Sequence, residues 1–158
     1  MYPQIIIYLI ILLTGLIIIR SCLILVTVKH NSMAPSLIEG DRVLVVKHWP
    51  RYLLKIGQIV LIKPPMRVDS QNYVPYIKRI LGLPNSTVII KIEEIDEYKR
   101  KLYIEDFDSE GRRNWVIPNG FVFVRGDSIY STDSRDWGPI PLNRIVGLVI
   151  FKFPLTTK

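Results

Sequence analysis

An uninterrupted apolar segment near the N-terminus most constrains what this chain can fold into. From Ile5 to Ile19, 15 residues carry no charge, and all but two of them are apolar. A helix from Ile5 to about Ile24 would be about 30 Å long, which matches the hydrocarbon core of a bilayer. Arg20, near its end, could extend its charge to the lipid headgroups. We therefore expect residues 1–25 to form a permanent, single-pass membrane anchor.

Other interpretations of this segment fit less well. A cleaved signal peptide needs a basic region before the apolar run and a small-x-small site after it, and neither is present. The residues around Cys22 resemble a lipoprotein cleavage box only faintly, because Arg20 interrupts it. A buried helix of a soluble protein is rarely so long and so apolar.

The charges beside the segment predict an orientation. The first four residues contain no Lys or Arg, whereas Arg20 and Lys29 follow the apolar run. Because cytoplasmic flanks are enriched in Lys and Arg, this distribution places the large domain in the cytoplasm.

Residues 26–158 have the composition of a turn-rich β domain. The chain contains 11 Pro and nine Gly, and these residues separate short runs rich in β-branched and aromatic side chains. We predict a mainly β fold, an antiparallel barrel or sandwich with little helix. The strands expected are Arg42–Lys47, Gln58–Ile62, Tyr73–Leu81, Thr87–Ile92 and Gly120–Arg125.

Charge is unevenly distributed along this domain. Lys91 to Arg113 contains eight of the 14 acidic residues and six basic ones, which indicates either a solvated hairpin inserted around 86–118 or a plain exposed surface. The rest of the chain has a basic surplus within a net charge of +7. No nucleic-acid motif accompanies it, so we expect anionic membrane lipid as the partner and no nucleic acid. The single cysteine, Cys22, excludes a disulfide framework and a CxxC metal site, and we expect no metal and no cofactor.

Three segments carry polar residues that could perform chemistry. The first is HNSMAPSL, residues 30–37, in which Ser32 lies three residues before Pro35 in a predicted turn. Taken alone, a serine in such a turn is usually structural.

The second segment places Lys78 within an apolar strand, Tyr76–Leu81. Alternation puts Lys78 on one face with Ile80 and puts Arg79 on the other, so the pattern does not say which cation is buried, and both could reach solvent. A buried lysine has chemical value, because desolvation lowers its pKa and a neutral amine can accept a proton from serine.

The third segment, Gly126–Pro139, is rich in hydroxyls and aspartates between glycines and builds a polar turn. Asp133 and Arg135 could form a structural ion pair there. The Ser131 hydroxyl could orient the Lys78 amine.

In their order along the chain, these motifs resemble those of type I signal peptidases. The matching stretches are SMAPSL, GDRVLV, YIKRILGLP and GDSIYSTDSRDWGPIP, followed by IVG near the end. This family comprises membrane-anchored Ser-Lys endopeptidases and includes bacterial leader peptidase and the mitochondrial inner-membrane peptidase. The resemblance implies an antiparallel β catalytic domain that lies at the membrane surface on the extracytoplasmic face, against the orientation that the charges predict. It also implies exported preproteins as substrates.

The resemblance implies roles for individual residues. Ser32 matches the nucleophile, and its backbone N–H matches part of the oxyanion hole. Lys78 matches the general base, Ser131 the hydroxyl that orients it, and Asp133 with Arg135 the structural pair. The shallow pockets for small substrate residues fall at Val28, Leu37 and Ile77.

The sequence departs from the family pattern in three places. His30 stands where many bacterial members have a hydroxyl residue that assists the oxyanion hole. Asn85-Ser86 replaces the usual Gly-Asp, which alters a turn only. The loop from Asp127 to Ser131 is one residue shorter than usual, which could shift Ser131 relative to Lys78.

The sequence therefore predicts a membrane-bound serine endopeptidase that removes signal peptides. A dedicated maturation peptidase for one precursor would use the same chemistry. A non-catalytic, membrane-anchored peptide-binding protein is a further alternative, against which the intact Ser32 and Lys78 argue. Soluble self-cleaving repressors share the dyad, but they carry a DNA-binding domain where this chain has its apolar segment. A partner subunit is neither indicated nor excluded.

Overall fold

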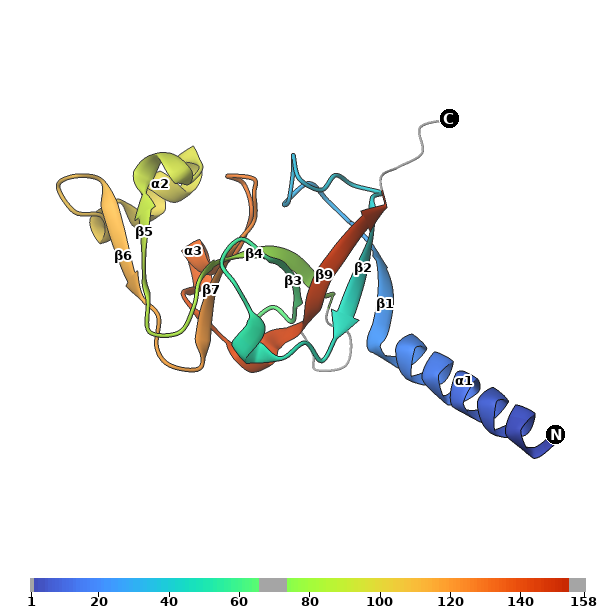
Figure 1. The fold of residues 1–158 in the computed structure, drawn as a ribbon. Helices are drawn as coiled ribbons and strands as arrows, with labels where there is room; N and C mark the ends of the chain where they lie inside the picture. The colour runs from blue at the N-terminus through green and yellow to red at the C-terminus, as the bar shows by residue number, and fades with distance from the viewer. Residues whose placement is uncertain (1, 66–73, 154–158) are drawn as a thin grey trace.

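The computed structural model describes residues 2–65 and 74–153. Helix α1 (Tyr2–Cys22) projects from one end of a β domain (Figure 1). Its segment Gln4–Cys22 has a mean hydropathy of 2.6 and no buried residues, so it is long and apolar enough to cross a bilayer. The helix ends at Cys22 instead of near Ile24, because Leu23–Thr27 forms a strand, β1, that pairs along its whole length with β2. The division of the chain at residue 25 stays a prediction.

Seven strands form one antiparallel sheet in the order β1-β2-β9-β3-β4-β7-β8. Strand β9, the longest, pairs with β2 on one side and with β3 on the other, so it joins the N-terminal strands to those that carry the polar motifs. Besides β1, the strands of this sheet are β2 (Arg42–Lys47), β3 (Ile59–Ile62), β4 (Tyr76–Gly82), β7 (Phe121–Arg125), β8 (Ile140–Pro141) and β9 (Ile145–Phe153).

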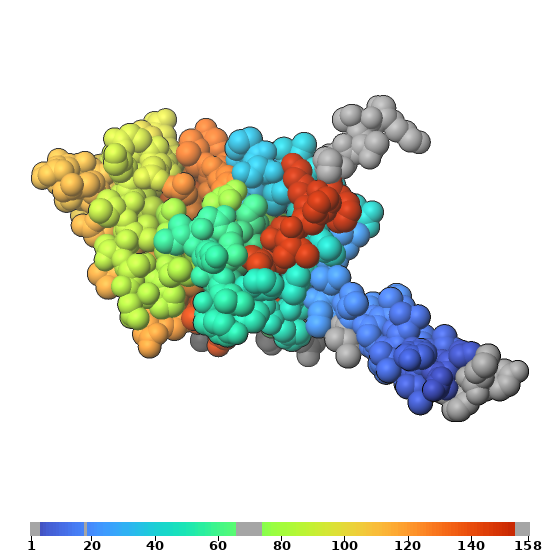
Figure 2. All heavy atoms as spheres, viewed as in Figure 1, coloured from blue at the N-terminus to red at the C-terminus, as the bar shows by residue number. Residues whose placement is uncertain are grey.

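A smaller unit lies at the end of the molecule opposite α1 (Figures 1 and 2). Strands β5 (Thr87–Lys91) and β6 (Arg112–Val116) pair as a two-stranded sheet, and helix α2 (Glu97–Tyr103) lies between them in the chain. We call residues 87–116 the insert. Helix α3 (Ser134–Trp137) is a single turn beside β7. Turns of 3-10 helix occupy Arg51–Leu53, Ile92–Glu94, Ile104–Asp106 and Leu142–Arg144.

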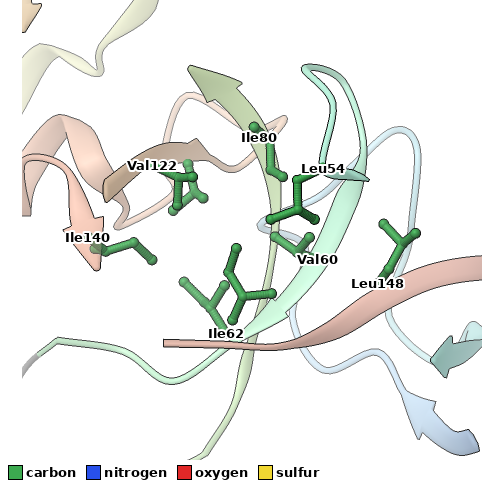
Figure 3. Close-up of a cluster of buried hydrophobic side chains, with 9 residues drawn as sticks. Leu54, Val60, Ile62, Ile80, Val122, Ile140 and Leu148 are labelled. Carbon is green, nitrogen blue, oxygen red and sulfur yellow. The ribbon is translucent and has the colours of Figure 1, made fainter. Parts of the chain in front are cut away.

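The main core lies among β3, β4, β7, β8 and β9 (Figure 3). Its aliphatic side chains come from alternating positions of these strands, as expected when one face of an antiparallel sheet is buried. Val60, Ile62, Ile80, Val122 and Val124 are fully buried in it. This core holds β4, the strand that carries Lys78, in a fixed position.

The mainly β prediction is confirmed, and the five expected strands all occur, with ends shifted by a few residues. Of the expected strand Tyr73–Leu81, Tyr73 lies outside the described residues, and β4 begins at Tyr76, after Pro75, which has no N–H for the ladder. The sequence did not predict β1, β6, β8, β9 or the short helix α2. The segments that form β1 and β9 lack a clear alternation of apolar and polar residues, and only their pairing with distant strands defines them. Helix α2 is too short to show helical periodicity.

Gly147 of β9 lies so close to β2 that a side chain has no room there. A Cβ at this position would overlap the backbone oxygen of Val46 and lie 2.7 Å from Val45 Cγ1. Strands β2 and β9 therefore pack closely at this point of the sheet.

We therefore expect Gly147→Ala to lower the free energy of unfolding by about 2 kcal/mol, because a backbone atom cannot move aside as a side chain can. Thermal unfolding in detergent micelles measures the effect. Gly15→Ala is the control, since a Cβ at Gly15 has nothing within 4 Å. Equal melting temperatures for the two variants would contradict this assignment.

Candidate active site

Ser32 lies in the turn that connects β1 to β2. The turn is closed by Ala34 N, which donates to Asn31 O at 3.1 Å, and by Leu37 N, which donates to Met33 O at 2.9 Å. The Met33 and Leu37 side chains are buried and anchor the turn in the core. Ser32 itself stays half-buried, so its hydroxyl is held at the surface of a fixed turn.

Lys78 lies in the middle of β4, opposite Val60 of β3, and only 2% of it is exposed. Its amine donates to the Ser131 hydroxyl at 2.6 Å and lies 5.5 Å from the centroid of the Tyr76 ring. The neighbouring Arg79 keeps 31% of its side chain exposed. The structure therefore decides what alternation left open: Lys78 is the buried cation of this strand.

Burial lowers the pKa of Lys78 from 10.5 to about 8. Desolvation of the ammonium is the largest cause. Asp133 and Asp136 oppose it by raising the pKa, whereas Arg135 and Lys99 lower it further. The shift corresponds to roughly 3 kcal/mol against the charged form, at about 1.4 kcal/mol per pKa unit. Near pH 8 the amine is neutral in about half of the molecules, as a general base requires.

The Ser32 turn and the loop that carries Ser131 are in direct contact. Ser128 N donates to Ser32 O at 3.2 Å. A Cβ on Gly126 would lie 2.5 Å from Ser32 O and would overlap the side chain of Ser131, so glycine is needed where the three segments meet. Within residues 2–65 and 74–153, the hydroxyl and backbone N–H of Ser32 make no hydrogen bond, which leaves both available to a substrate.

The buried pair Asp133–Arg135 fixes the Ser131 loop. Arg135 Nε and Nη2 donate to the two carboxylate oxygens of Asp133 at 2.9 and 2.8 Å, and both side chains are nearly inaccessible. The second oxygen of Asp133 also accepts from Gly126 N at 2.8 Å. Arg135 Nη2 donates to Ser128 O at 3.0 Å. Each buried charge is thus satisfied, and the loop is bound at both ends.

Arg79 joins the two loops from the other side of β4. Its guanidinium donates twice to the Asp127 carboxylate, at 2.8 and 2.7 Å, and also to Ser36 Oγ at 3.0 Å and Gly57 O at 2.7 Å. Sequence reasoning missed this clamp. The signal was present in the adjacent Lys78-Arg79 pair, because strand alternation sends their two side chains to opposite faces.

Lys99, from α2 of the insert, is a second residue that sequence reasoning did not single out. Its amine donates to Ser131 O at 2.7 Å and to Asp136 Oδ2 at 3.0 Å. In the sequence it is one of three adjacent basic residues of an apparently solvated segment, so no local pattern distinguishes it.

The three expected pocket residues share one buried cluster. Val28, Leu37 and Ile77 pack with Met33, Val43, Val45 and Leu61, and each is less than a tenth exposed. Their role in substrate binding stays a prediction. His30 is exposed, with φ of 64°. The short loop does not separate Ser131 from Lys78, since their side chains are hydrogen-bonded.

Comparison with known proteins defines the class to which this fold and site belong. The family profile described as "Signal peptidase, peptidase S26" matches residues 2–154. Probable signal peptidase I-1 of Synechocystis sp. is 31% identical over 138 residues, with 80% of this chain and 68% of that protein covered. Thylakoidal processing peptidase 1, chloroplastic, of Arabidopsis thaliana is 30% identical over 140 residues, and the match covers 80% of this chain but only 41% of that protein. A crystal structure of a signal peptidase I from Enterococcus faecalis V583 aligns with a TM-score of 0.43 at 20% identity, over 61% of this chain and 97% of that chain.

The chain belongs to the signal peptidase family, peptidase S26. Members of this family are serine endopeptidases that remove signal peptides from preproteins, which confirms the predicted class of enzyme. Together with the apolar helix α1, family membership indicates that the enzyme is anchored in a membrane.

The buried amine predicts an unusual stability profile. Between pH 8 and 10.5 the unfolded chain binds more protons at Lys78 than the folded chain does, so this group makes stability rise with pH across that window. Below pH 8 the folded chain bears the full free-energy cost of burying the charged amine. We expect Lys78→Met to raise the free energy of unfolding at pH 7 by up to about 3 kcal/mol, reduced by the lost hydrogen bond to Ser131.

Denaturant unfolding of the wild type and the variant at pH 7 and pH 10.5 measures this difference. Lys101→Met is the matched control, because the Lys101 side chain is 77% exposed and its ion pair is with the exposed Glu97. A Lys78→Met protein that is less stable than the wild type at pH 7 would refute the profile.

Proposed function

We propose that Ser32 and Lys78 are the catalytic dyad with which this chain cleaves signal peptides from exported preproteins. The observation that carries the proposal is the Lys78 amine, which is buried, has a lowered pKa and is hydrogen-bonded to Ser131 in the loop that contacts Ser32. A lysine inside an apolar strand is costly, and its use as a base explains why it is there.

In the first half of the reaction, Ser32 Oγ attacks the scissile carbonyl carbon while Lys78 Nζ accepts the hydroxyl proton. The free N–H of Ser32 donates to the oxyanion that develops. The C–N bond then breaks, the Lys78 ammonium returns the proton to the leaving amine, and an acyl-enzyme on Ser32 remains. The Ser131 hydroxyl keeps the amine oriented because it accepts a hydrogen bond from Nζ.

In the second half, a water molecule attacks the acyl carbon and gives its proton to Lys78. The ester bond breaks, the proton passes from Lys78 to Ser32 Oγ, and the cleaved signal peptide departs as a carboxylic acid that ionises to the carboxylate by giving its proton to solvent. Apart from water, the chemistry requires only groups of this chain.

Cleavage of a preprotein by purified protein tests the dyad. We expect Ser32→Ala and Lys78→Ala each to lower kcat/KM at least about 1000-fold. For the wild type, kcat/KM should rise with pH through an apparent pKa of about 8, because the neutral amine is the reactive form. Ser109→Ala, at an exposed turn of the insert, should behave like the wild type. Full activity of either dyad variant would end the proposal, and peptide binding without any cleavage by the wild type would favour a non-catalytic role.

Exposed apolar side chains along the sheet edge next to α1 support a domain that lies against lipid. Strand β1 continues directly from α1, and β2 connects it to β9 (Figure 1). Apolar side chains on these strands are substantially exposed: Ile24, Leu25, Ile150, Phe151 and Phe153. The rings of Phe151 and Phe153 pack edge to face, with their centroids 4.7 Å apart. Together they form a compact apolar surface suited to the bilayer interface.

We further propose that the domain lies on the extracytoplasmic face, where signal peptides emerge, although the flanking charges favour the opposite side. The charge rule rests here on two basic residues, Arg20 and Lys29. Protease added to sealed, right-side-out membranes should therefore degrade the domain, and inverted vesicles should protect it until detergent is added. The reverse pattern would support the orientation that the charges predict.

A further inference from the structure

The insert contacts the candidate active site at two residues: the carbonyl oxygen of Glu94 accepts from Arg135 Nη1, and Lys99 binds the Ser131 loop. Lys99 of α2 donates to the backbone oxygen of Ser131 at 2.7 Å and to Asp136 Oδ2 at 3.0 Å, and only 13% of its side chain is exposed. Helix α2 and the Ser131 loop are separated by the whole of β6 and β7 in the sequence, so this contact exists only in the folded chain (Figure 1).

The start of α2 directs Lys99 inward. The carboxylate of Asp96 caps the helix by accepting from Lys99 N at 3.0 Å, and its second oxygen lies 3.8 Å from the Lys99 amine. Buried side chains of the insert, including Ile90 and Ile95, pack in one cluster with Phe123 of β7 and so join the insert to the main domain. Lys101, one half-turn further on, points to solvent. The contrast between the two lysines shows that the position of Lys99 is specific.

Ser131 is held at two atoms by two amines. Its hydroxyl accepts from Lys78, and its carbonyl oxygen accepts from Lys99, with a longer contact of 3.4 Å from Arg135. The residue belongs to a loop without regular structure, so its backbone has no sheet or helix ladder to fix it. Within the loop the Ser131 N–H donates to Ser128 O at 3.2 Å, and Lys99 adds a restraint on the carbonyl oxygen from outside the loop.

We propose that Lys99 is a positioning residue, through which the insert holds Ser131 and thereby aims the Lys78 amine at Ser32. The inference rests on the proposed Ser32–Lys78 chemistry and assigns the insert a part in it. Among the described residues, the Lys99 amine makes no hydrogen bond to Ser32. It acts through the Ser131 carbonyl.

The same cation contributes to the electrostatics of the base. The charged groups that act on Lys78 are Asp133, Asp136 and Arg135 of the loop and Lys99 of the insert, and the Tyr76 ring lies beside the amine on β4. Removing Lys99 takes away a positive charge and leaves Asp136 without its cation. Both changes favour the protonated amine, so the apparent pKa of the reaction should rise.

Preprotein cleavage by the full chain in detergent tests the inference. We expect Lys99→Met to lower kcat about 10-fold or more, because a small misplacement of a base is costly, while KM stays within about twofold. The acid limb of kcat/KM should move to higher pH. Lys99→Arg, which keeps the charge, should leave the acid limb near that of the wild type. Lys101→Met is the matched control from the same helix and should match the wild type in rate and pH profile.

A double-mutant cycle separates positioning from a merely structural role. If Lys99 acts through Ser131, Lys99→Met should have little further effect on kcat in a Ser131→Ala background. Lys99→Gln gives the same readouts if the Met variant does not fold. Wild-type kcat and an unmoved pH profile in folded Lys99→Met or Lys99→Gln would overturn the inference and leave the dyad intact, and so would full additivity with Ser131→Ala. A wild type that cleaves nothing would instead overturn the proposed function.

Discussion

The hydrogen bond between the Lys78 amine and the Ser131 hydroxyl is the interaction on which the rest of the site depends. It requires a cation-forming group to lie inside a β core, where the charged form is disfavoured by roughly 3 kcal/mol. The aliphatic core around β4, with Val60 and Ile80 fully buried, excludes water from the amine and also offsets its cost. Stability and reactivity are therefore coupled at one residue, because the burial that destabilises the ammonium is what makes the amine basic at useful pH.

The loop that presents Ser131 is organised by charges and not by a backbone ladder. Asp133 and Arg135 neutralise each other in the interior, and their remaining hydrogen-bonding groups bind backbone atoms of the same loop and, through Arg135 Nη1, the carbonyl oxygen of Glu94 in the insert. Arg79 with Asp127 joins this loop to the Ser32 turn, and Lys99 joins it to the insert. Three structural units thus converge on a segment of a few residues. A buried ion pair that makes many backbone contacts gives little net stability, but it selects a single loop geometry.

Much of this site was predictable from the sequence, because its residues lie in short motifs of distinctive composition. Ser32, Lys78, Ser131, Asp133 and Arg135 were singled out from the order and content of those motifs, and the structure brings their segments together. The Arg79 clamp and Lys99 were not. Their partners lie 48 and 32 residues away in the chain, and no local pattern distinguishes a lysine that faces a loop from one that faces solvent. The same limit applies to β9, whose place inside the sheet follows from pairing with β2 and β3.

The sequence by itself determined the apolar helix, the β character of the domain and the identity of the polar motifs, because these depend on composition and on short-range periodicity. Only the tertiary structure decided which of two adjacent cations is buried, where the apolar run changes from helix to strand, and which lysine of the insert reaches the active-site loop. Each of those outcomes depends on what packs against a residue from a distant part of the chain. Desolvation and strand pairing are properties of that assembled environment, so they have no signature in any short window of sequence.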